Sequence, residues 1–302
     1  MGALTYEPDR SPAAGTGTVD LDALARDAEQ VYEGETVEGL ATLLKLGGSP
    51  GGARPKVLLG LSPSGEQIVH GVDDLPDDYR PVIVKFPSPD DDPTIGAVEA
   101  AYADMARAAG IDVPPTRLLP AEHGPGYFAV ERFDRDDATK RHSATFAGLF
   151  HADHRLPSVD YADLLKGTGW LTRDRRAVDQ HFRRMVFNVL AHNRDDHTKN
   201  HGYLMDRDGQ WTLAPAYDLT PSFGPGGEHA LAVGDDGRQP GRKDILSVAA
   251  AVGISRDTTE TTITVVAKAV AKWPVFAASY GLGQTTVASV AELHERAVVE
   301  SV

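Results

Sequence analysis

The sequence predicts an α+β fold of two lobes, in which a β-rich N-terminal lobe is followed by a mainly helical C-terminal lobe. Strand-like runs of Val, Ile and Leu alternate with helical segments up to about residue 135, and amphipathic helical patterns dominate after it. A chain of 302 residues can bury the core of one large domain or of two lobes. We place the boundary at this change of pattern, with residues 1–133 in the N-terminal lobe and residues 134–302 in the C-terminal lobe.

In the N-terminal lobe, two helices and several strands are expected. A helix begins after Asp20, a favourable N-cap, because apolar residues follow it at helical spacing, and a second helix over residues 94–111 stops near a glycine. The segment "VPPTRLLP" is expected to be extended. Strands are expected over residues 57–61, 68–72, 81–87 and 126–135.

The C-terminal lobe is expected to hold one hairpin among amphipathic helices. The segments "HGYLM" and "QWTLA" flank "DRDG", a turn sequence that is typical of a β-hairpin. Apolar residues at helical spacing predict helices before and after this hairpin. These helices are expected over residues 179–193, 243–254, 259–273 and 285–299.

Composition limits the function classes. The formal net charge of −14 argues against a general binder of nucleic-acid backbones, which needs a basic face. The chain has no cysteine, so disulfides, thiolate nucleophiles and Cys-ligated zinc are excluded. No apolar run approaches the roughly 20 residues of a membrane span, and the N-terminus does not resemble a signal peptide. A soluble cytoplasmic protein with no direct nucleic-acid partner and no membrane contact is therefore expected.

The segment "NRDDHTKNHGYLMD" carries the clearest chemical pattern. Asn200 follows Asp195 by five residues, as Asn follows Asp in the H-R-D-x-x-x-x-N loop of protein kinases. The expected hairpin returns the chain, so Asp218 of "PAYDL" can lie beside that loop. In phosphoryl transfer one carboxylate accepts the hydroxyl proton, while a second carboxylate and an amide oxygen hold Mg²⁺. Asp196, the second of the adjacent aspartates, is expected to serve the hydrogen bonding of the loop.

Two other interpretations of this segment stay open. A charged helix end and a solvated turn would explain the same residue types without any catalysis. A zinc site would use His192, His197 and His201, but there is no H-E-x-x-H motif, and the Asn and Asp content argues against a helix that would align these rings.

The N-terminal lobe offers groups for a nucleotide. Lys85 ends the strand "VIVK", and a lysine in a buried strand needs an anion, for which Glu99 in the following helix is a candidate. The segment "GGSPGGARPK" can wrap phosphates with backbone N–H groups, and its Arg54 and Lys56 add positive charge, although it matches neither the Walker A nor the G-x-G-x-x-G pattern. Backbone groups over residues 130–133 can pair with an adenine edge.

Together these segments resemble the HipA family of serine/threonine kinases, the toxins of bacterial toxin–antitoxin modules. The resemblance rests on "LGGSPGGARPKVLL", "VIVKFP", "VEAAYADMARAAGIDVPPTRLL", "YFAVERFDR", "NRDDHTKNHGYL" and "LAPAYDL", and extends over most of the chain. It implies a two-lobed, protein-kinase-like fold and phosphoryl transfer that depends on ATP and Mg²⁺.

The resemblance also implies a role for each matching residue. Asp195 is expected as the catalytic base, Asn200 and Asp218 as Mg²⁺ ligands, Lys85 on the ATP phosphates, and Ser49 as a serine whose autophosphorylation inactivates the kinase by charge repulsion. Glu99 is expected in a structural ion pair. Together with Lys85, the residues expected to bind ATP are Ser49, Gly51, Gly52, Arg54, Lys56, Glu131, Phe133, His197 and Lys199.

The expected partners are a protein substrate and an antitoxin. Substrates in this family include aminoacyl-tRNA synthetases, but the motifs do not identify the substrate of this chain. Family members carry an N-terminal subdomain before the point where "GALTYEPD" begins, so we expect a short form, with that subdomain missing or supplied by a separate protein. A kinase-like phosphotransferase for small molecules, a catalytically inactive module that binds a nucleotide or partner, and a metallohydrolase are the alternatives.

Overall fold

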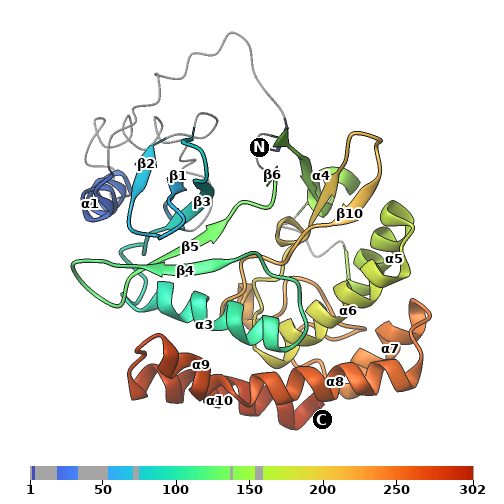
Figure 1. Ribbon diagram of the computed structural model, residues 1–302. Helices are drawn as coiled ribbons and strands as arrows, with labels where there is room; N and C mark the ends of the chain where they lie inside the picture. The colour runs from blue at the N-terminus through green and yellow to red at the C-terminus, as the bar shows by residue number, and fades with distance from the viewer. Residues whose placement is uncertain are drawn as a thin grey trace.

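The computed structural model has the predicted two-lobed α+β architecture (Figure 1). It describes residues 2–3, 19–32, 54–70, 75–136, 139–153 and 159–301. In that part of the chain, no helix is long and apolar enough to cross a membrane. The exact boundary predicted between residues 133 and 134 stays a prediction.

One antiparallel sheet forms the N-terminal lobe. Its five strands lie in the order β2-β1-β3-β5-β4. The central strands are rich in Val and Leu, and their buried residues form one core with α1 (Leu21–Tyr32), whose first turn Asp20 caps through its Oδ1. The strands are β1 (Lys56–Leu61), β2 (Ile68–His70), β3 (Arg80–Lys85), β4 (Thr116–Leu119) and β5 (Tyr127–Glu131).

Helix α3 (Ile95–Ala108) joins the two lobes. It lies between the sheet and the layer of C-terminal helices, and it contacts β4 and β5 on one side and α8 and α9 on the other (Figure 1). Its buried residues belong to the core of the helical lobe. Tyr102 anchors it there, because its hydroxyl donates to the carbonyl of Ala191 at 2.8 Å and its ring packs edge-on against Phe187 and Trp273.

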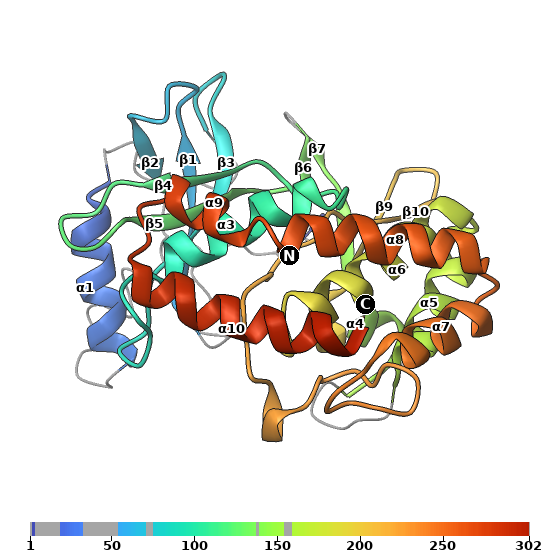
Figure 2. The same ribbon diagram turned by 90° about the horizontal axis from the view of Figure 1, so that it is seen from below.

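The C-terminal lobe is built mainly of helices. Figure 2 shows α8 and α10 running across one side of the molecule, with α6 behind them, and these three helices contact one another. The helices are α4 (Phe146–Phe150), α5 (Tyr161–Thr172), α6 (Arg175–Leu190), α7 (Arg242–Ala251), α8 (Arg256–Val270), α9 (Trp273–Ser279) and α10 (Gln284–Ser301), with 3-10 turns η1 (Thr198–Asn200) and η2 (Pro225–Gly227).

Two small sheets lie at the junction. The predicted hairpin is confirmed as β9 (Gly202–Met205) and β10 (Trp211–Leu213), and β8 (His142–Thr145) extends it to three strands. A second pair is formed by β6 (Arg135–Asp136) and β7 (Thr139–Lys140).

The strand predicted over residues 126–135 is shorter than expected. It ends at Glu131, because the buried guanidinium of Arg132 turns back onto the carboxylate of Asp134 with two hydrogen bonds of 2.9 and 2.8 Å. The helix predicted over residues 179–193 also begins earlier, at Arg175. The side chain of Asp174 accepts from the N–H of Arg176 and caps that first turn.

Candidate functional site

Lys85 forms the centre of an ion-pair cluster between the lobes, in which Glu99 is buried and Asp218 is partly exposed. It ends β3, and its Nζ donates to Glu99 Oε1 of α3 at 2.6 Å and to Asp218 Oδ1 in a direct contact. The same Nζ lies 5.7 Å from the centre of the Phe128 ring, its neighbour on β5. Lys85 and Asp218, which lie far apart in the sequence, therefore contact each other. The ion pair that the sequence suggested between Lys85 and Glu99 is also present.

The charges in this cluster stabilise one another. Burial would lower the pKa of Lys85, but the carboxylates of Asp218 and Glu99 raise it well above its ordinary value. Lys85 holds the pKa of Asp218 below its usual range, in spite of the opposing effect of burial. Burial raises the pKa of Glu99, and the attraction of Lys85 only partly offsets this effect. Lys85 is thus kept charged, which is what binding a polyphosphate requires.

Asp218 lies in an unusual backbone conformation. Its φ of 58° falls in the left-handed region, which Asp and Asn tolerate better than other residues with a Cβ. His192, just after α6, has a φ of 54°. The two strained residues flank the polar loop, and strain of this kind often accompanies functional sites.

The loop after α6 presents Asp195 and Asn200 side by side. The Nδ2 of Asn200 donates to the backbone carbonyl of Asp195 at 2.8 Å. Because a carbonyl only accepts, the Oδ1 of Asn200 is the amide atom left for a cation. Among the described residues, Asp218 Oδ2 also accepts no hydrogen bond. Two hard oxygens are thus left for a ligand, and such oxygens fit Mg²⁺.

The carboxylate of Asp195 faces solvent beside His197. Its side chain is 56% exposed, and its Oδ1 lies 3.7 Å from His197 Nε2. Burial of part of the group raises the pKa of Asp195, His197 opposes this shift, and the negative charge of Asp218 reinforces it. A carboxylate with a raised pKa and open access is suited to accept a proton.

Asp196 is a structural anchor beneath the loop. Its fully buried carboxylate accepts from the Tyr161 hydroxyl at 2.6 Å, from His229 Nδ1 at 2.8 Å and from the N–H groups of Ala230 and Leu231 at 2.8 and 3.4 Å. These contacts tie the loop to α5 and to the segment that follows η2. The prediction that Asp196 serves hydrogen bonding in the loop is confirmed.

Asp196→Asn is expected to lower the free energy of unfolding by about 2 kcal/mol, because its amide would face at least one buried donor with an N–H group. Urea denaturation of the variant and of wild type measures the change. Asp208→Asn, in the exposed hairpin turn, is the matched control and should leave stability unchanged. Equal stability of Asp196→Asn and wild type would contradict the anchoring role.

The histidines near the loop also make structural contacts. His201 Nε2 lies 3.1 Å from the Asp196 carbonyl and must donate to it, so its Nδ1 accepts from His181 Nε2 at 2.7 Å. His192 Nδ1 donates to the carbonyl of Ser222. Within the part of the chain that the structure describes, no three His, Asp or Glu side chains converge on a shared metal site.

Arg54 has a partner that the sequence interpretation missed. Its guanidinium forms hydrogen bonds of 2.9 to 3.1 Å to both carboxylate oxygens of Asp91. Ser88 also donates to Asp91 from its backbone and its hydroxyl. Burial would raise the pKa of Asp91, but these donors hold it below the ordinary value. Asp91 therefore anchors Arg54 just before β1 begins at Lys56.

Three other residues predicted to bind the nucleotide lie on or after the strands of the N-terminal sheet. Lys56 pairs with Lys85 across β1 and β3, and Glu131 ends β5, where its N–H donates to Pro115. The ring of Phe133 stacks on Tyr217, with centroids 5.7 Å apart.

Tyr217 in turn donates its hydroxyl to the carbonyl of Lys199, whose side chain is exposed. Ser49, Gly51 and Gly52 lie outside the described residues.

Sequence reasoning did not find the polar residues that support the loop. Asn188 donates to the Tyr161 hydroxyl at 2.9 Å and accepts from Asn193 at 3.0 Å, and His181 and Tyr161 are fully buried. Asn188 and His181 interrupt the apolar face of α6, and polar residues on such a face could have indicated buried hydrogen bonds. Nothing local in the sequence connects Tyr161 or His229 to Asp196.

Two known proteins named as kinases are similar to part of this chain. The chain is 31% identical over 153 residues to "Putative kinase Y4dM" of Sinorhizobium fredii, a match that covers 45% of this chain and 36% of that protein. It is 27% identical over 147 residues to "Putative kinase" of Haemophilus influenzae, covering 44% of this chain and 43% of that one. Each match spans less than half the length of the relative.

Among solved structures, the fold is similar to a chain in the complex of HipA, HipB and operator DNA from the Shewanella oneidensis toxin–antitoxin system. The TM-score is 0.64 at 19% identity, and the match covers 83% of this chain and 64% of that one. The model of the family described as "HipA-like C-terminal domain" matches residues 48–273, well over half of the sequence. The chain therefore belongs to the HipA-like C-terminal domain family.

Proposed function

We propose that this protein is a kinase that uses Mg·ATP to phosphorylate a serine or threonine of another protein. The observation that carries the proposal is the ion-pair cluster of Lys85, Glu99 and Asp218, which lies next to the loop with Asp195 and Asn200. This combines a cation for phosphates, oxygens for a metal and an accessible carboxylate. Membership of the HipA-like family and the two relatives named as kinases support the same chemistry.

The residues would divide the work as follows. Lys85 would bind the ATP phosphates, held in place by Glu99, while Asn200 Oδ1 and the Asp218 carboxylate would hold Mg²⁺. The bound metal would supply positive charge that stabilises the phosphates. Asp195 would orient the acceptor hydroxyl and take its proton as that oxygen bonds to the γ-phosphorus and the bond from this phosphorus to ADP breaks. ADP then leaves with its negative charge, and the proton ends on the carboxylate. The raised pKa of Asp195 makes it a better acceptor than an ordinary aspartate.

Partners and regulation belong to the same proposal. Autophosphorylation at Ser49, a substrate among the aminoacyl-tRNA synthetases and an antitoxin partner follow from the family resemblance. The similar Shewanella chain was solved with HipB and operator DNA, which favours an antitoxin partner for this protein as well. That complex contains DNA, so it does not support the expectation that this protein has no direct nucleic-acid partner. The expectation stays a prediction.

Incubating the purified protein with γ-labelled ATP and Mg²⁺ tests the proposal. We expect phosphate on the protein itself, with mass spectrometry assigning it to Ser49, and no incorporation when EDTA replaces Mg²⁺. Transfer to a sugar or aminoglycoside instead of to protein would favour a small-molecule phosphotransferase. Binding of Mg·ATP without transfer to any acceptor would indicate an inactive binding module, and the kinase proposal would then fail.

A further inference from the structure

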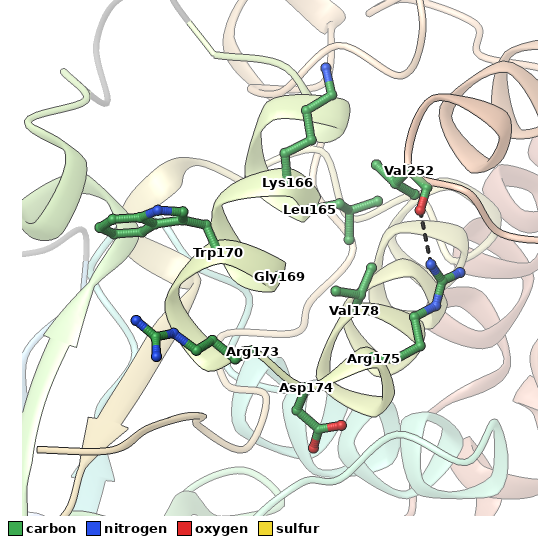
Figure 3. Close-up of a pocket in the computed structure, with 9 residues that line it drawn as sticks. All are labelled: Leu165, Lys166, Gly169, Trp170, Arg173, Asp174, Arg175, Val178 and Val252. Carbon is green, nitrogen blue, oxygen red and sulfur yellow. Dashed lines mark hydrogen bonds between the residues drawn. The ribbon is translucent and has the colours of Figure 1, made fainter.

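A groove on the helical lobe lies apart from the Lys85 cluster. It is formed by the second half of α5, the tight turn into α6 and the residue after α7, and it has a volume of about 550 Å³ (Figure 3). No residue of the proposed phosphoryl-transfer site lines it. Its lining residues are Leu165, Lys166, Gly169, Trp170, Arg173, Asp174, Arg175, Val178 and Val252.

The floor of this groove is apolar and firmly held. Leu165 and Val178 are buried, and Gly169 keeps the two helices close, since a Cβ there would lie 3.3 Å from Val178. On the other side of the groove, Arg175 links the start of α6 to the end of α7. Its guanidinium donates to the carbonyls of Val252 and Gly253, each at 3.0 Å. Figure 3 shows the hydrogen bond to Val252 as a dashed line. The groove is thus part of the packed framework of the lobe.

Trp170 is exposed at the edge of the groove. Its residue exposure of 73% is the largest among the exposed large hydrophobic residues of the described chain. Phe150 contacts one edge of the indole, with ring centroids 6.1 Å apart, and Figure 3 shows the ring projecting from α5. Tryptophan is the residue type most enriched at protein–protein hot spots, where its large apolar surface is covered by a partner.

Two exposed cations lie before and after this indole in the chain, and Figure 3 shows Arg173 projecting on the same side as the ring. Lys166 precedes Trp170 by four residues on α5, a spacing that favours one side of a helix, and Arg173 follows as the C-cap residue of α5, with a left-handed φ of 53°. All three are exposed. In the described part of the chain, the Arg173 guanidinium has no ion-pair or hydrogen-bond partner, and Lys166 lies only 3.8 Å from an exposed Asp163 carboxylate.

Apart from the exposed Asp163, two nearby acidic groups make contacts within the fold. Asp174 accepts from the N–H of Arg176 and caps α6, and Asp179 accepts from Arg175 Nε at 3.0 Å. Arg173 is therefore left to pair with a partner, and Lys166 can join it, because its exposed contact with Asp163 contributes little in water. Such a face attracts acidic chains that the rest of the surface repels.

We propose that this face of α5 and the adjoining groove bind an acidic segment of a partner protein, with an apolar side chain of that segment packed against Trp170. The cations fit carboxylates on both sides of the anchor, and the apolar floor fits the anchor itself. This inference goes beyond the proposed phosphoryl transfer and holds or fails independently of it.

Selection from a phage-displayed library of random peptides tests this inference. The whole protein is the bait, and Trp170→Ala protein is used for counter-selection. We expect enriched peptides with several Asp or Glu around one aromatic or aliphatic residue. Measured by fluorescence polarisation, a selected peptide should bind Trp170→Ala at least about tenfold more weakly and Lys166→Glu several-fold more weakly, and affinity should fall as salt rises.

Val275→Ala and Lys268→Glu are the matched controls, because each alters an exposed residue of the same kind on other helices. Both should bind like wild type, and all four variants should keep the wild-type circular dichroism and melting temperature. The inference is overturned by an absence of enriched peptides, by peptides without acidic bias, or by equal binding to Trp170→Ala. Sedimentation showing a dimer that Trp170→Ala dissociates would overturn it in favour of a second copy of this chain.

Discussion

Asp195→Asn is expected to reduce the rate of phosphoryl transfer by roughly 10²- to 10⁴-fold, the usual contribution of a positioned general base. The amide has nearly the same shape but cannot take a proton from the acceptor hydroxyl. Because the Asp195 side chain is 56% exposed and its own carbonyl, not its carboxylate, receives Asn200, the fold of the loop should be retained. Initial rates of phosphate incorporation from labelled ATP measure the loss.

Nucleotide binding separates this role from that of the ion-pair cluster. Asp195→Asn should keep an affinity for Mg·ATP within about twofold of wild type by isothermal titration, since the carboxylate is not among the groups assigned to the nucleotide. Asp218→Asn should weaken that affinity, because it removes a metal ligand and a partner of Lys85. A wild-type rate for Asp195→Asn would show that another group accepts the proton.

The features that the sequence predicted correctly depend on local spacing or on strong periodicity. The hairpin of β9 and β10 and the helix that Asp20 caps are coded within about a dozen residues each, and the structure contains both. The roles predicted for Asp195 and Asn200 stay predictions, although the hydrogen bond from Asn200 to the Asp195 carbonyl shows that this spacing brings the two residues together.

Helix α5 was missed because two of its residues are poor helix formers. Gly167 and Gly169 suggest a loop when they are considered alone, since glycine costs about 1 kcal/mol in a helix interior. The structure explains their presence through packing, because a Cβ on Gly167 would lie 2.6 Å from the Phe146 ring. Leu164 and Leu165 are buried, and Asp160 caps the first turn, so tertiary contacts outweigh propensity.

The supporting contacts of the site were missed for a different reason. Asp91 belongs to an acidic stretch that looks like solvated surface, yet it receives Arg54 from a distant part of the chain. Asp196 and His229 are 33 residues apart, and no periodic pattern relates them. Pairings of this kind follow from how the loops fold over the helical lobe, so a single sequence does not reveal them.

The stability of the fold is expected to fall steeply as the pH drops below about 6.5. Four buried histidines, His181, His192, His201 and His294, have pKa values lowered chiefly by burial, and those of His192, His201 and His294 are lowered to about 4. In the unfolded chain they titrate near 6.5. The contribution of these histidines to the free energy of unfolding is therefore complete above that pH. It is lost as the pH falls, because the unfolded state then binds more protons than the native state.

His201 shows the size of this effect. Its shift from 6.5 to about 4 corresponds to a loss on the order of 3 kcal/mol across that window, and the hydrogen bond it donates to Asp196 transmits the loss to the loop of Asp195. Urea denaturation from pH 7 to 5 should show the decline, and His201→Gln should flatten the slope by about 1.4 kcal/mol per pH unit. His123→Gln, at an exposed loop position, is the control for the substitution itself. A wild-type slope in His201→Gln would mean that the His201 ring of the native protein is already positively charged, with protons on both nitrogens. That state is unfavourable, because His201 Nδ1–H would then face His181 Nε2–H, a second donor.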